Sequence, residues 1–392
     1  MKNLLLFLTA YLILLSSCSP KAEVAGELSL IRVDPSDVTE YYDLANDVEE
    51  EYDFVELETL DTCLIDNIDI VVFQNDHYYV YDGNGSTVFL FDTAGRFVSK
   101  LFKQGQGPDE YIRLDGFALK DSTIWVVDPM TGYMIAYDSR FKMIDRIDMK
   151  ETILPDHLDF IGDTMLVATN WWGSKKSNIQ FGMYHVKSKR MEGLLSVGER
   201  PANAILYSKA SQMAISGNSC LFDLSHCDTI FELKDGVFAP RYKMAFTERY
   251  EDIHLTEEEY FDISKKYLIR GIEDIKQTKN AVWLGFYNNR IFNSAVYNKE
   301  SKTTQVYSAF INSNISSKLE ILQHRTYMDR NNEILVSIHN VEDVLAAFKT
   351  DESISKIKNE VMRKKIKAIV SGLAEDANPL LLKQKIRKDA KL

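Results

Sequence analysis

The sequence predicts an all-β protein, a β-propeller with helical insertions, on the basis of an internal repeat and of the residues that make it up. Residues 77–101 align with residues 123–147 without a gap, at an offset of 46 residues. Asp82 of the first copy matches Asp128 of the second. A period of 40–50 residues with several strands per unit is typical of propeller blades, which pack around a common axis.

Each copy follows the same order of runs and turns. A β-rich run ends in Asp, a turn containing glycine follows, a second β-rich run ends in Asp, and a third apolar run closes the unit. Val, Ile, Tyr, Phe and Trp favour the pleated surface of a sheet, and Asp and Gly favour turns. The pattern predicts three consecutive antiparallel strands per copy, with the Asp residues most simply explained by turn geometry.

Weaker copies continue towards the C-terminus. The strands that they predict are Thr164–Thr169, Gln180–Val186, Cys220–Asp223, Thr229–Leu233, Arg241–Ala245, Ala281–Tyr287, Asn293–Asn298, Thr303–Tyr307, Arg325–Asp329 and Glu333–His339. The last blade lacks strands locally, and either Leu28–Val33 or Leu380–Ile386 is available to complete it. Closing the ring with both chain ends removes exposed sheet edges. The chain length is sufficient for six or seven blades.

Two segments, about residues 256–275 and 341–373, depart from the β pattern and predict helical insertions. Thr256 and Glu259 form a capping box, which favours a helix after it. The second segment carries an approximate apolar helix face. That face consists of Ile354, Ile357, Val361, Ile369 and Leu373. Residues 353–392 contain 11 Lys or Arg and 4 Asp or Glu. A basic segment of this kind is able to face a membrane surface, but the favoured interpretation is a solvated helix face.

The N-terminus has the layout of a secretory signal peptide over residues 1–17, followed by a tether over residues 18–27. Its apolar run, Leu4–Leu15, is too short to span a bilayer. Leu15-Ser16-Ser17-Cys18 resembles a bacterial lipobox, in which the cysteine is acylated and becomes the first mature residue. The alternative is an ordinary signal peptide that has a cysteine at its cleavage site.

By analogy with lipoprotein sorting, Ser19 after the cysteine favours the outer membrane. The absence of an acidic cluster in residues 19–23 favours its periplasmic side.

Composition excludes several classes of function. A net charge of −12 argues against a nucleic-acid partner. Beyond Cys18 only three cysteines remain, too few for a disulfide scaffold. Cys220 and Cys227 either pair with each other or stay buried as free thiols. No Cys and His spacing indicates a zinc site, and no cofactor is predicted.

The segment Gly105–Tyr111 has two interpretations. Its glycines would let a ligand approach the backbone, and Asp109 and Glu110 are possible cation ligands. The favoured interpretation is a tight connection between blades, with glycines at positive φ and Tyr111 packed between the blades.

The adjacent aromatic residues Trp171 and Trp172 lie in a loop rich in Gly, Ser and Lys. They are the candidate binding residues, as a stacking platform for sugars or peptides. The alternative is that they cover the edge of a blade.

Several motifs together carry a family resemblance. They are Phe91-Asp92, Gly95-Arg96-Phe97, Gly105-Gln106-Gly107-Pro108-Asp109-Glu110-Tyr111, Ile124–Asp128, Tyr52–Leu60, Thr229-Ile230-Phe231 and Asn378-Pro379-Leu380-Leu381. In these motifs the chain resembles the six-bladed β-propeller lipoproteins common in Bacteroidota, propellers of the NHL or TolB-like kind. The resemblance implies six blades over residues 28–392 and an envelope location, and it supplies no catalytic residues.

The function expected from the sequence is a membrane-anchored binding or scaffold module for a protein, a peptide or a glycan. The alternative is a metal-dependent hydrolase or lyase, similar to lactonases, with its site at the channel mouth. The sequence has neither a His-Glu-x-x-His motif nor a Gly-x-Ser-x-Gly elbow. Three or more carboxylate or amide oxygens converging at one channel mouth would favour the enzyme.

Overall fold

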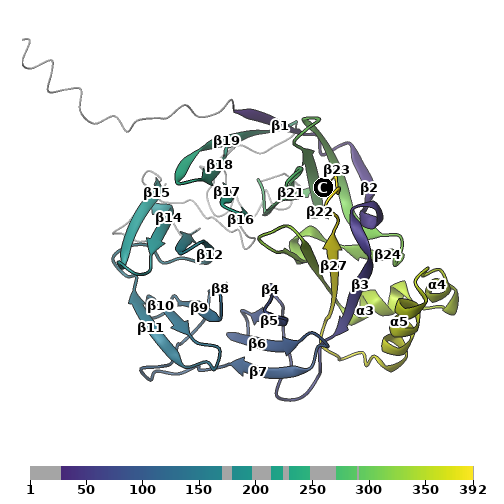
Figure 1. Cartoon of the computed structure of the whole chain (residues 1–392), viewed down its shortest axis with the longest axis horizontal. Coiled ribbons are helices and arrows are strands. Elements are labelled where there is room, and N and C mark those ends of the chain that lie inside the picture. Colours follow the sequence, from purple (N-terminus) through teal and green to yellow (C-terminus); the bar gives the residue numbers. More distant parts are fainter. Residues whose placement is uncertain are drawn as a thin grey trace, which may run out of the picture.

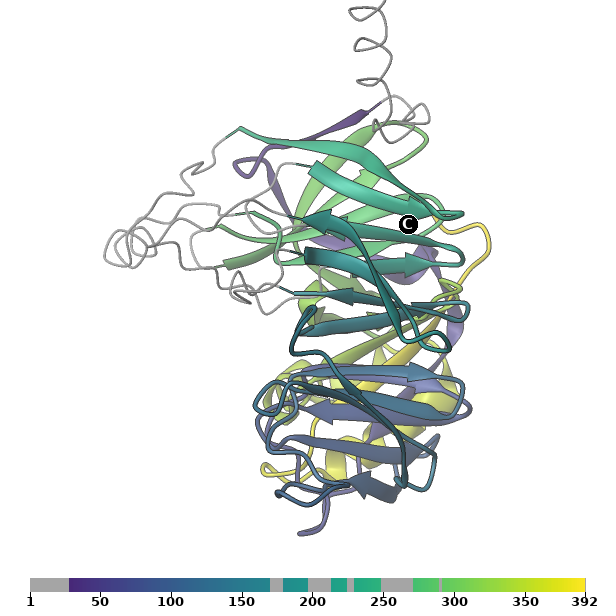
Figure 2. The same ribbon diagram turned by 90° about the vertical axis from the view of Figure 1, so that its left-hand side faces the viewer.

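Six sheets lie around a common axis and form a β-propeller (Figure 1). The structure is a computed structural model, and it describes residues 28–169, 179–196, 213–223, 229–247, 271–288 and 291–391. Figure 2 shows the same ring from its edge. The expected fold class and the number of six blades implied by the family resemblance are confirmed.

The blades follow one another along the chain, and each begins with its innermost strand. Blade I comprises β4 (Ile70–Gln74), β5 (His77–Asp82), β6 (Thr87–Asp92) and β7 (Phe97–Leu101). Blade II comprises β8 (Gly116–Lys120), β9 (Thr123–Asp128), β10 (Tyr133–Tyr137) and β11 (Met143–Asp148). Blade III comprises β12 (His157–Ile161), β13 (Thr164–Ala168), β14 (Ile179–His185) and β15 (Arg190–Ser196).

The second half of the ring carries additional strands. Blade IV comprises β16 (Met213–Ser216), β17 (Ser219–Asp223), β18 (Thr229–Lys234) and β19 (Val237–Phe246). Blade V comprises β20 (Asp274–Gln277), β21 (Ala281–Asn288), β22 (Ile291–Asn298), β23 (Thr303–Asn312) and β24 (Ser316–Ile321). Blade VI comprises β25 (Thr326–Met328), β26 (Ile334–His339), β27 (Leu380–Ile386) and β3 (Val48–Glu56). Two 3-10 turns are η1 (Leu44–Asn46) and η2 (Gln323–Arg325).

The repeated unit found in the sequence corresponds to the three outer strands of each blade. The copies at 77–101 and 123–147 coincide with β5–β7 and β9–β11. An additional inner strand, β4 or β8, precedes each copy, so the blade has four strands and not the three that the pattern predicts. The weaker copies are confirmed as strands of blades III to VI.

The N-terminal segment runs along the outer edges of three successive blades. β1 (Ser29–Val33) pairs in parallel with β19 of blade IV, and β2 (Val38–Asp43) pairs in parallel with β23 of blade V. β3 then pairs antiparallel with β27 and completes blade VI. The prediction that Leu28–Val33 completes the last blade is therefore wrong, because β3 takes that edge, whereas the alternative segment Leu380–Ile386 is confirmed as β27.

The ring closes where β3 meets blade I. The Glu58 amide donates to the Gly95 carbonyl at 2.8 Å, and the Phe97 amide donates to the Glu58 carboxylate at 2.8 Å. The buried Asn378 side chain donates to the carbonyls of Glu58 and Cys63, each at 2.8 Å. The motif around Asn378 therefore joins the segment before β27 to the segment after β3, and the motif around Gly95 joins that same segment to blade I.

The hydrophobic core lies between neighbouring blades. Phe181 of blade III stacks on Phe222 of blade IV with ring centroids 4.3 Å apart, and both side chains are fully buried. Stacked aromatic pairs of this kind add to the stabilisation that comes from burial of apolar area.

Three helices separate β26 from β27 and lie outside the ring beside blade VI (Figure 1): α3 (Val341–Ala347), α4 (Asp351–Ser355) and α5 (Glu360–Gly372). The helical prediction for 341–373 is confirmed, but as three short helices. Ile354 and Ile357 are buried as expected, whereas Val361 is 69% exposed and Ile366 is the buried residue of α5. The predicted residues do not form a single apolar face, because the chain turns between α4 and α5.

The other helical prediction, about residues 256–275, falls mostly outside the described residues. Its end is wrong, because Asp274 begins the inner strand β20.

Lysine and arginine residues of the basic C-terminal segment form ion pairs with nearby carboxylates. The pairs are Lys356 with Glu352, Lys364 with Glu360, Lys383 with Asp53, Lys385 with Glu49 and Arg387 with Asp389. These pairs offset part of the positive charge of the segment.

Candidate functional site

The six inner strands enclose a central channel with a volume of about 1590 Å³. Residues of all six blades line it. Ligand sites in proteins are usually concave, with mostly apolar walls and a few converging polar groups. The channel is therefore the candidate functional site.

One end of the channel is crossed by the turn between β25 and β26, residues 329–333. Arg330 of this turn donates to the carboxylate of Asp159 at 2.5 Å and to the carbonyl of Leu119 at 3.0 Å. Its own carbonyl accepts from the Gly217 amide at 2.8 Å. Blade III, which supplies Asp159, lies opposite blade VI in the ring, so the turn spans the channel and obstructs this end.

Asn332 holds the same turn against two further blades. Its side chain bonds to the hydroxyl of Ser216 at 2.5 Å and to the carbonyl of Gln277. The ends of four inner strands are thus tied to one turn, and the channel opens mainly at the end where those strands begin.

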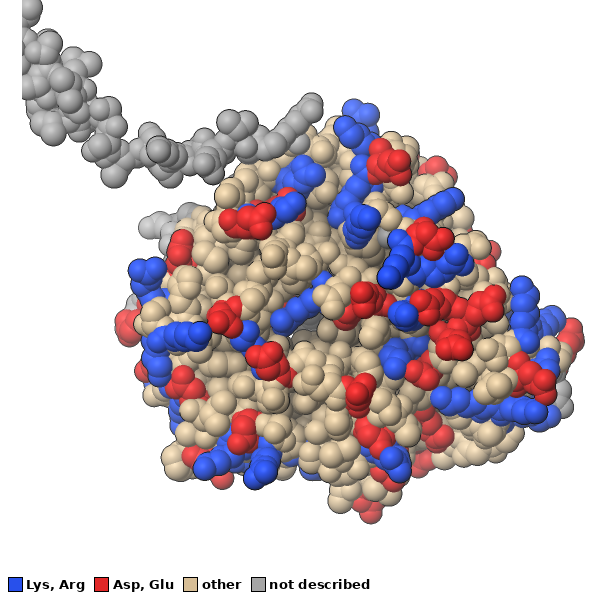
Figure 3. Space-filling view, viewed as in Figure 1, with Lys and Arg blue, Asp and Glu red and all other residues tan. Residues whose placement is uncertain are grey.

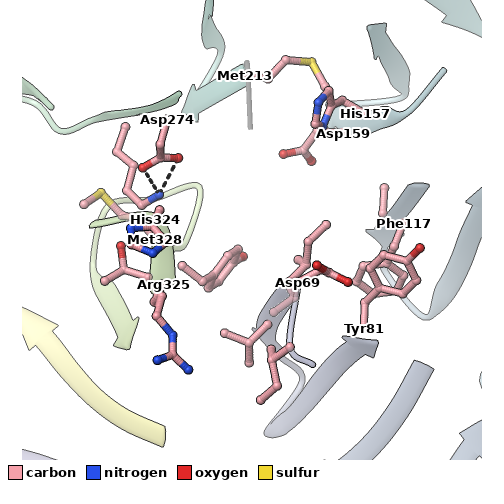
Figure 4. Close-up of a pocket in the computed structure, with 18 of the residues that line it drawn as sticks. Asp69, Tyr81, Phe117, His157, Asp159, Met213, Asp274, His324, Arg325 and Met328 are labelled. Atoms are coloured by element: carbon pink, nitrogen blue, oxygen red, sulfur yellow. Dashed lines mark hydrogen bonds and ion pairs between the residues drawn. The ribbon is translucent and has the colours of Figure 1, made fainter. Parts of the chain in front are cut away.

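The walls of the channel differ in character from blade to blade (Figure 4). Blades I, II and IV contribute the apolar side chains Ile70, Val72, Phe117, Leu119, Met213 and Ile215, and blades I and II also contribute the charged residues Asp69, Arg113 and Asp115. Blade III contributes His157 and Asp159, and blade V contributes Asp274 and Lys276. Figure 4 shows these polar groups on different sides of the opening.

Two carboxylates of the channel wall are neutralised within the protein. Asp274 accepts from the ammonium of Lys276 at 2.7 Å, and Asp159 pairs with Arg330 at 2.5 Å. Enclosure in the channel raises the pKa of Asp159, although Arg330 opposes this shift. Within the described ranges, no three His, Cys, Asp or Glu side chains are grouped so that they would hold a metal ion.

The rim at the start of blade VI carries His324 and Arg325, which end the turn η2. Burial lowers the pKa of His324, whose ring lies 4.2 Å from the Phe292 ring between centroids. Its imidazole is therefore neutral at neutral pH.

One face of the ring is shown in space-filling form in Figure 3. Basic and acidic side chains lie beside one another around the central opening in this view. Neither sign of charge dominates that face, in contrast to the continuous basic patch that nucleic-acid binding requires.

The segment Gly105–Tyr111 is a connection between blades I and II, as the favoured interpretation predicts. Tyr111 is fully buried, and its hydroxyl donates to the Ser86 carbonyl at 2.8 Å and accepts from the Lys103 amide at 3.0 Å. The carboxylate of Glu110 accepts from the Gly107 amide at 2.7 Å. The motif therefore folds the loop back on itself.

The expected reason for the glycines in this loop is wrong. Neither Gly105 nor Gly107 has a positive φ. A Cβ atom at Gly105 would instead collide with the carboxylate of Glu110. A larger residue at this position would therefore displace the Glu110 carboxylate from the loop.

The Asp residues shared by the two clear repeats serve turns, as expected. The Asp128 carboxylate is fully buried and accepts from the amides of Ile112 and Met130 at 2.9 and 3.0 Å, and from the Thr131 hydroxyl at 2.7 Å. Asp82 accepts from the amides of Asp66 and Gly85 in the same way. These carboxylates fasten each blade to the incoming connection.

We expect Asp128→Ala to lower the free energy of unfolding by about 3 kcal/mol, because it leaves buried donors without an acceptor. The matched control is Asp138→Ala, which removes two backbone hydrogen bonds in an exposed turn and should cost about 1 kcal/mol. Urea denaturation followed by tryptophan fluorescence measures both. Equal losses of unfolding free energy in the two variants would contradict the structural role given to Asp128.

Several predicted site residues lie outside the described residues. They are Cys18, Trp171, Trp172 and Cys227. Cys220 and Cys63 are buried free thiols, and burial raises the pKa of both.

The residues that the structure brings to the channel were not identified as site residues from the sequence. Arg325 fell within the predicted strand Arg325–Asp329, and Arg330 in the turn after it. Inner strands lie outside the repeated unit, and a single charged residue near a strand end carries no signal of its own. Only the closed ring shows that these residues face one cavity.

The fold and the channel define the class of this protein: a six-bladed β-propeller with a large central cavity that is obstructed at one end. The chain belongs to the family described as a domain of unknown function, DUF4934, which matches residues 34–385. None of the helices in the described part of the chain is long and apolar enough to cross a membrane.

Two solved structures with a similar fold come from Bacteroides. A protein of Bacteroides fragilis, provisionally described as exported, is 15% identical with a TM-score of 0.68, covering 92% of this chain and all of its own. A member of the DUF4221 family from Bacteroides vulgatus is 11% identical with a TM-score of 0.52, covering 88% of this chain and 99% of its own. No curated protein matches the sequence.

Proposed function

We propose that the chain is an envelope lipoprotein, tethered to the outer membrane through Cys18, whose propeller binds a peptide, protein or glycan. The observation that carries the proposal is the central channel. It combines apolar side chains from three blades with charged groups distributed around its wall, and the Arg330 turn obstructs one end. Such a cavity suits a ligand that enters from the open end.

The proposed location rests on the lipobox-like sequence before Cys18. The exported description of the Bacteroides fragilis protein is in keeping with it. The alternative function, a metal-dependent hydrolase or lyase, has less support: Asp159 and Asp274 are engaged by Arg330 and Lys276, and among the described residues no three His, Cys, Asp or Glu side chains are grouped so that they would hold a metal ion.

The test is an affinity capture with residues 19–392, immobilised and exposed to solubilised envelope, with Met213→Trp as the channel variant. Met213 lies on the inner strand β16 and lines the channel (Figure 4). A tryptophan there narrows the opening, so the captured ligand should fall at least about tenfold, as expected when a well-packed site is disrupted.

The matched control is Ile144→Ser, at an exposed apolar position on the outer strand β11. This variant should capture as much ligand as the unsubstituted chain does. A further variant, Trp171→Ala with Trp172→Ala, tests the loop predicted from the sequence. If capture is lost only when both tryptophans are replaced, the binding site lies in that loop and not in the channel. Unchanged capture with Met213→Trp rejects the channel.

A further inference from the structure

Arg325 differs from every other lysine or arginine among the described residues that line the channel. Arg113 lies 3.0 Å from the carboxylate of Asp115, Lys276 lies 2.7 Å from that of Asp274, and Arg330 lies 2.5 Å from that of Asp159. The guanidinium of Arg325 comes no closer than 4.0 Å to a carboxylate, that of Asp343. Its short hydrogen bond, 2.7 Å, goes to the neutral amide of Asn340.

The partial burial of Arg325 makes the absence of a close counter-charge energetically unfavourable. Its side chain is only 26% exposed, while that of Asp343 is 58% exposed. Burial lowers the pKa of Arg325, and the distant Asp343 opposes this shift only in part. A partly buried cation that is not matched by an anion carries a desolvation cost, which an incoming anion would offset.

The location of Arg325 is suited to receive a ligand. It ends the turn η2 directly before the inner strand β25, so it lies at the open end of the channel, opposite the end that Arg330 obstructs. Arg325 is one of the residues that line the channel, and Figure 4 shows it on the same side as His324 and Met328. The neighbouring His324 is neutral, so Arg325 supplies the positive charge on this part of the rim.

We infer that Arg325 binds the carboxylate of a ligand whose apolar part enters the channel, and this inference rests on the proposed binding function. A guanidinium offers a planar, two-pronged donor set that matches a carboxylate. The apolar part would lie against Ile70, Phe117 and Met213 on the facing blades. Two sources share this chemistry: the C-terminus of an apolar peptide and a free fatty acid.

The size of the channel favours the peptide source. Pockets for small ligands usually measure about 300–1,000 Å³, and this channel measures about 1590 Å³. An extended peptide end would fill more of that space than a single acyl chain.

The experiment measures binding of two probe pairs to residues 19–392 by isothermal calorimetry. One pair is the acetylated tripeptide Ala-Leu-Phe with a free carboxylate or a terminal amide, and the other is decanoate and decanamide. The acid of the favoured pair should bind about 10- to 100-fold more tightly than its neutral partner, as expected for a hydrogen bond to a charged group. The pair that shows this preference identifies the source.

Arg325→Gln should abolish the preference for the acid, and Arg325→Lys, which keeps the charge, should retain part of it. The matched control is Arg113→Gln, because Arg113 lines the same end of the channel but is already paired with Asp115. It should leave the preference intact. Thermal unfolding of each variant verifies that the fold is kept.

Three outcomes overturn the inference: no binding of either acid, equal binding of acid and neutral probe, or equal losses for Arg325→Gln and Arg113→Gln. The proposed function is judged separately by the capture experiment. Capture that depends on Met213 but is unaffected by Arg325→Gln would uphold the binding channel and reject the carboxylate ligand.

Discussion

Gly95→Ala should destabilise the protein by about 3–4 kcal/mol, because it combines a strained backbone with a steric collision. Gly95 has φ +83°, in the left-handed region that favours glycine. A Cβ atom there would collide with the carbonyl oxygen of Glu56 and lie 2.8 Å from a methyl group of Val55. Both residues belong to β3, which completes blade VI, so the collision falls at the closure of the ring.

Gly236→Ala provides the matched control for this prediction. Gly236 has φ +78°, but no atom lies within 4 Å of the position that its Cβ would take. Its substitution should therefore cost about 1 kcal/mol, the backbone contribution alone. Urea denaturation measures both variants, and an equal effect would show that the contact with β3 contributes nothing to stability.

Cys18→Ala should release the protein from the membrane fraction almost completely. Each methylene group of an acyl chain contributes roughly 0.8 kcal/mol to membrane binding, and several chains make the attachment effectively permanent. The measurement is fractionation of cells after a carbonate wash, combined with metabolic labelling by an alkyne analogue of palmitate.

Ser19→Ala keeps the cysteine and should remain labelled and bound to the membrane. Retention of Cys18→Ala in the washed membranes would place the attachment elsewhere in the chain. Loss of the label with full retention would show that a protein partner, and not the lipid, holds the propeller at the membrane.

The outer strands of the blades could be predicted from sequence because their turns repeat. Asp82 and Asp128 occupy equivalent corners, and so do Asp92 and Asp138, which both accept backbone amides in tight turns. The inner strands have no such marker. The blade that Leu28–Val33 joins was also predicted wrongly, because pairing between distant segments depends on the closed ring and not on a local sequence pattern.

The candidate site could not be predicted for the same physical reason. Arg325 and Asp159 are ordinary charged residues in sequence, and their significance depends on which partners the ring brings near. Gly105 shows a different case: the sequence led to the expectation of a positive φ, whereas Gly105 has no positive φ and lies against the Glu110 carboxylate.

The path of the N-terminal segment has a consequence for biosynthesis. β1, β2 and β3 are made first, yet their partners are β19, β23 and β27, and Tyr52 pairs with Gln384 near the other end of the chain. These strands must wait without partners while the blades form. The run Glu49-Glu50-Glu51 is exposed on β3, and such charges discourage premature pairing of a free strand with another chain. We therefore expect these strands to close the propeller late in folding, after the blades have formed.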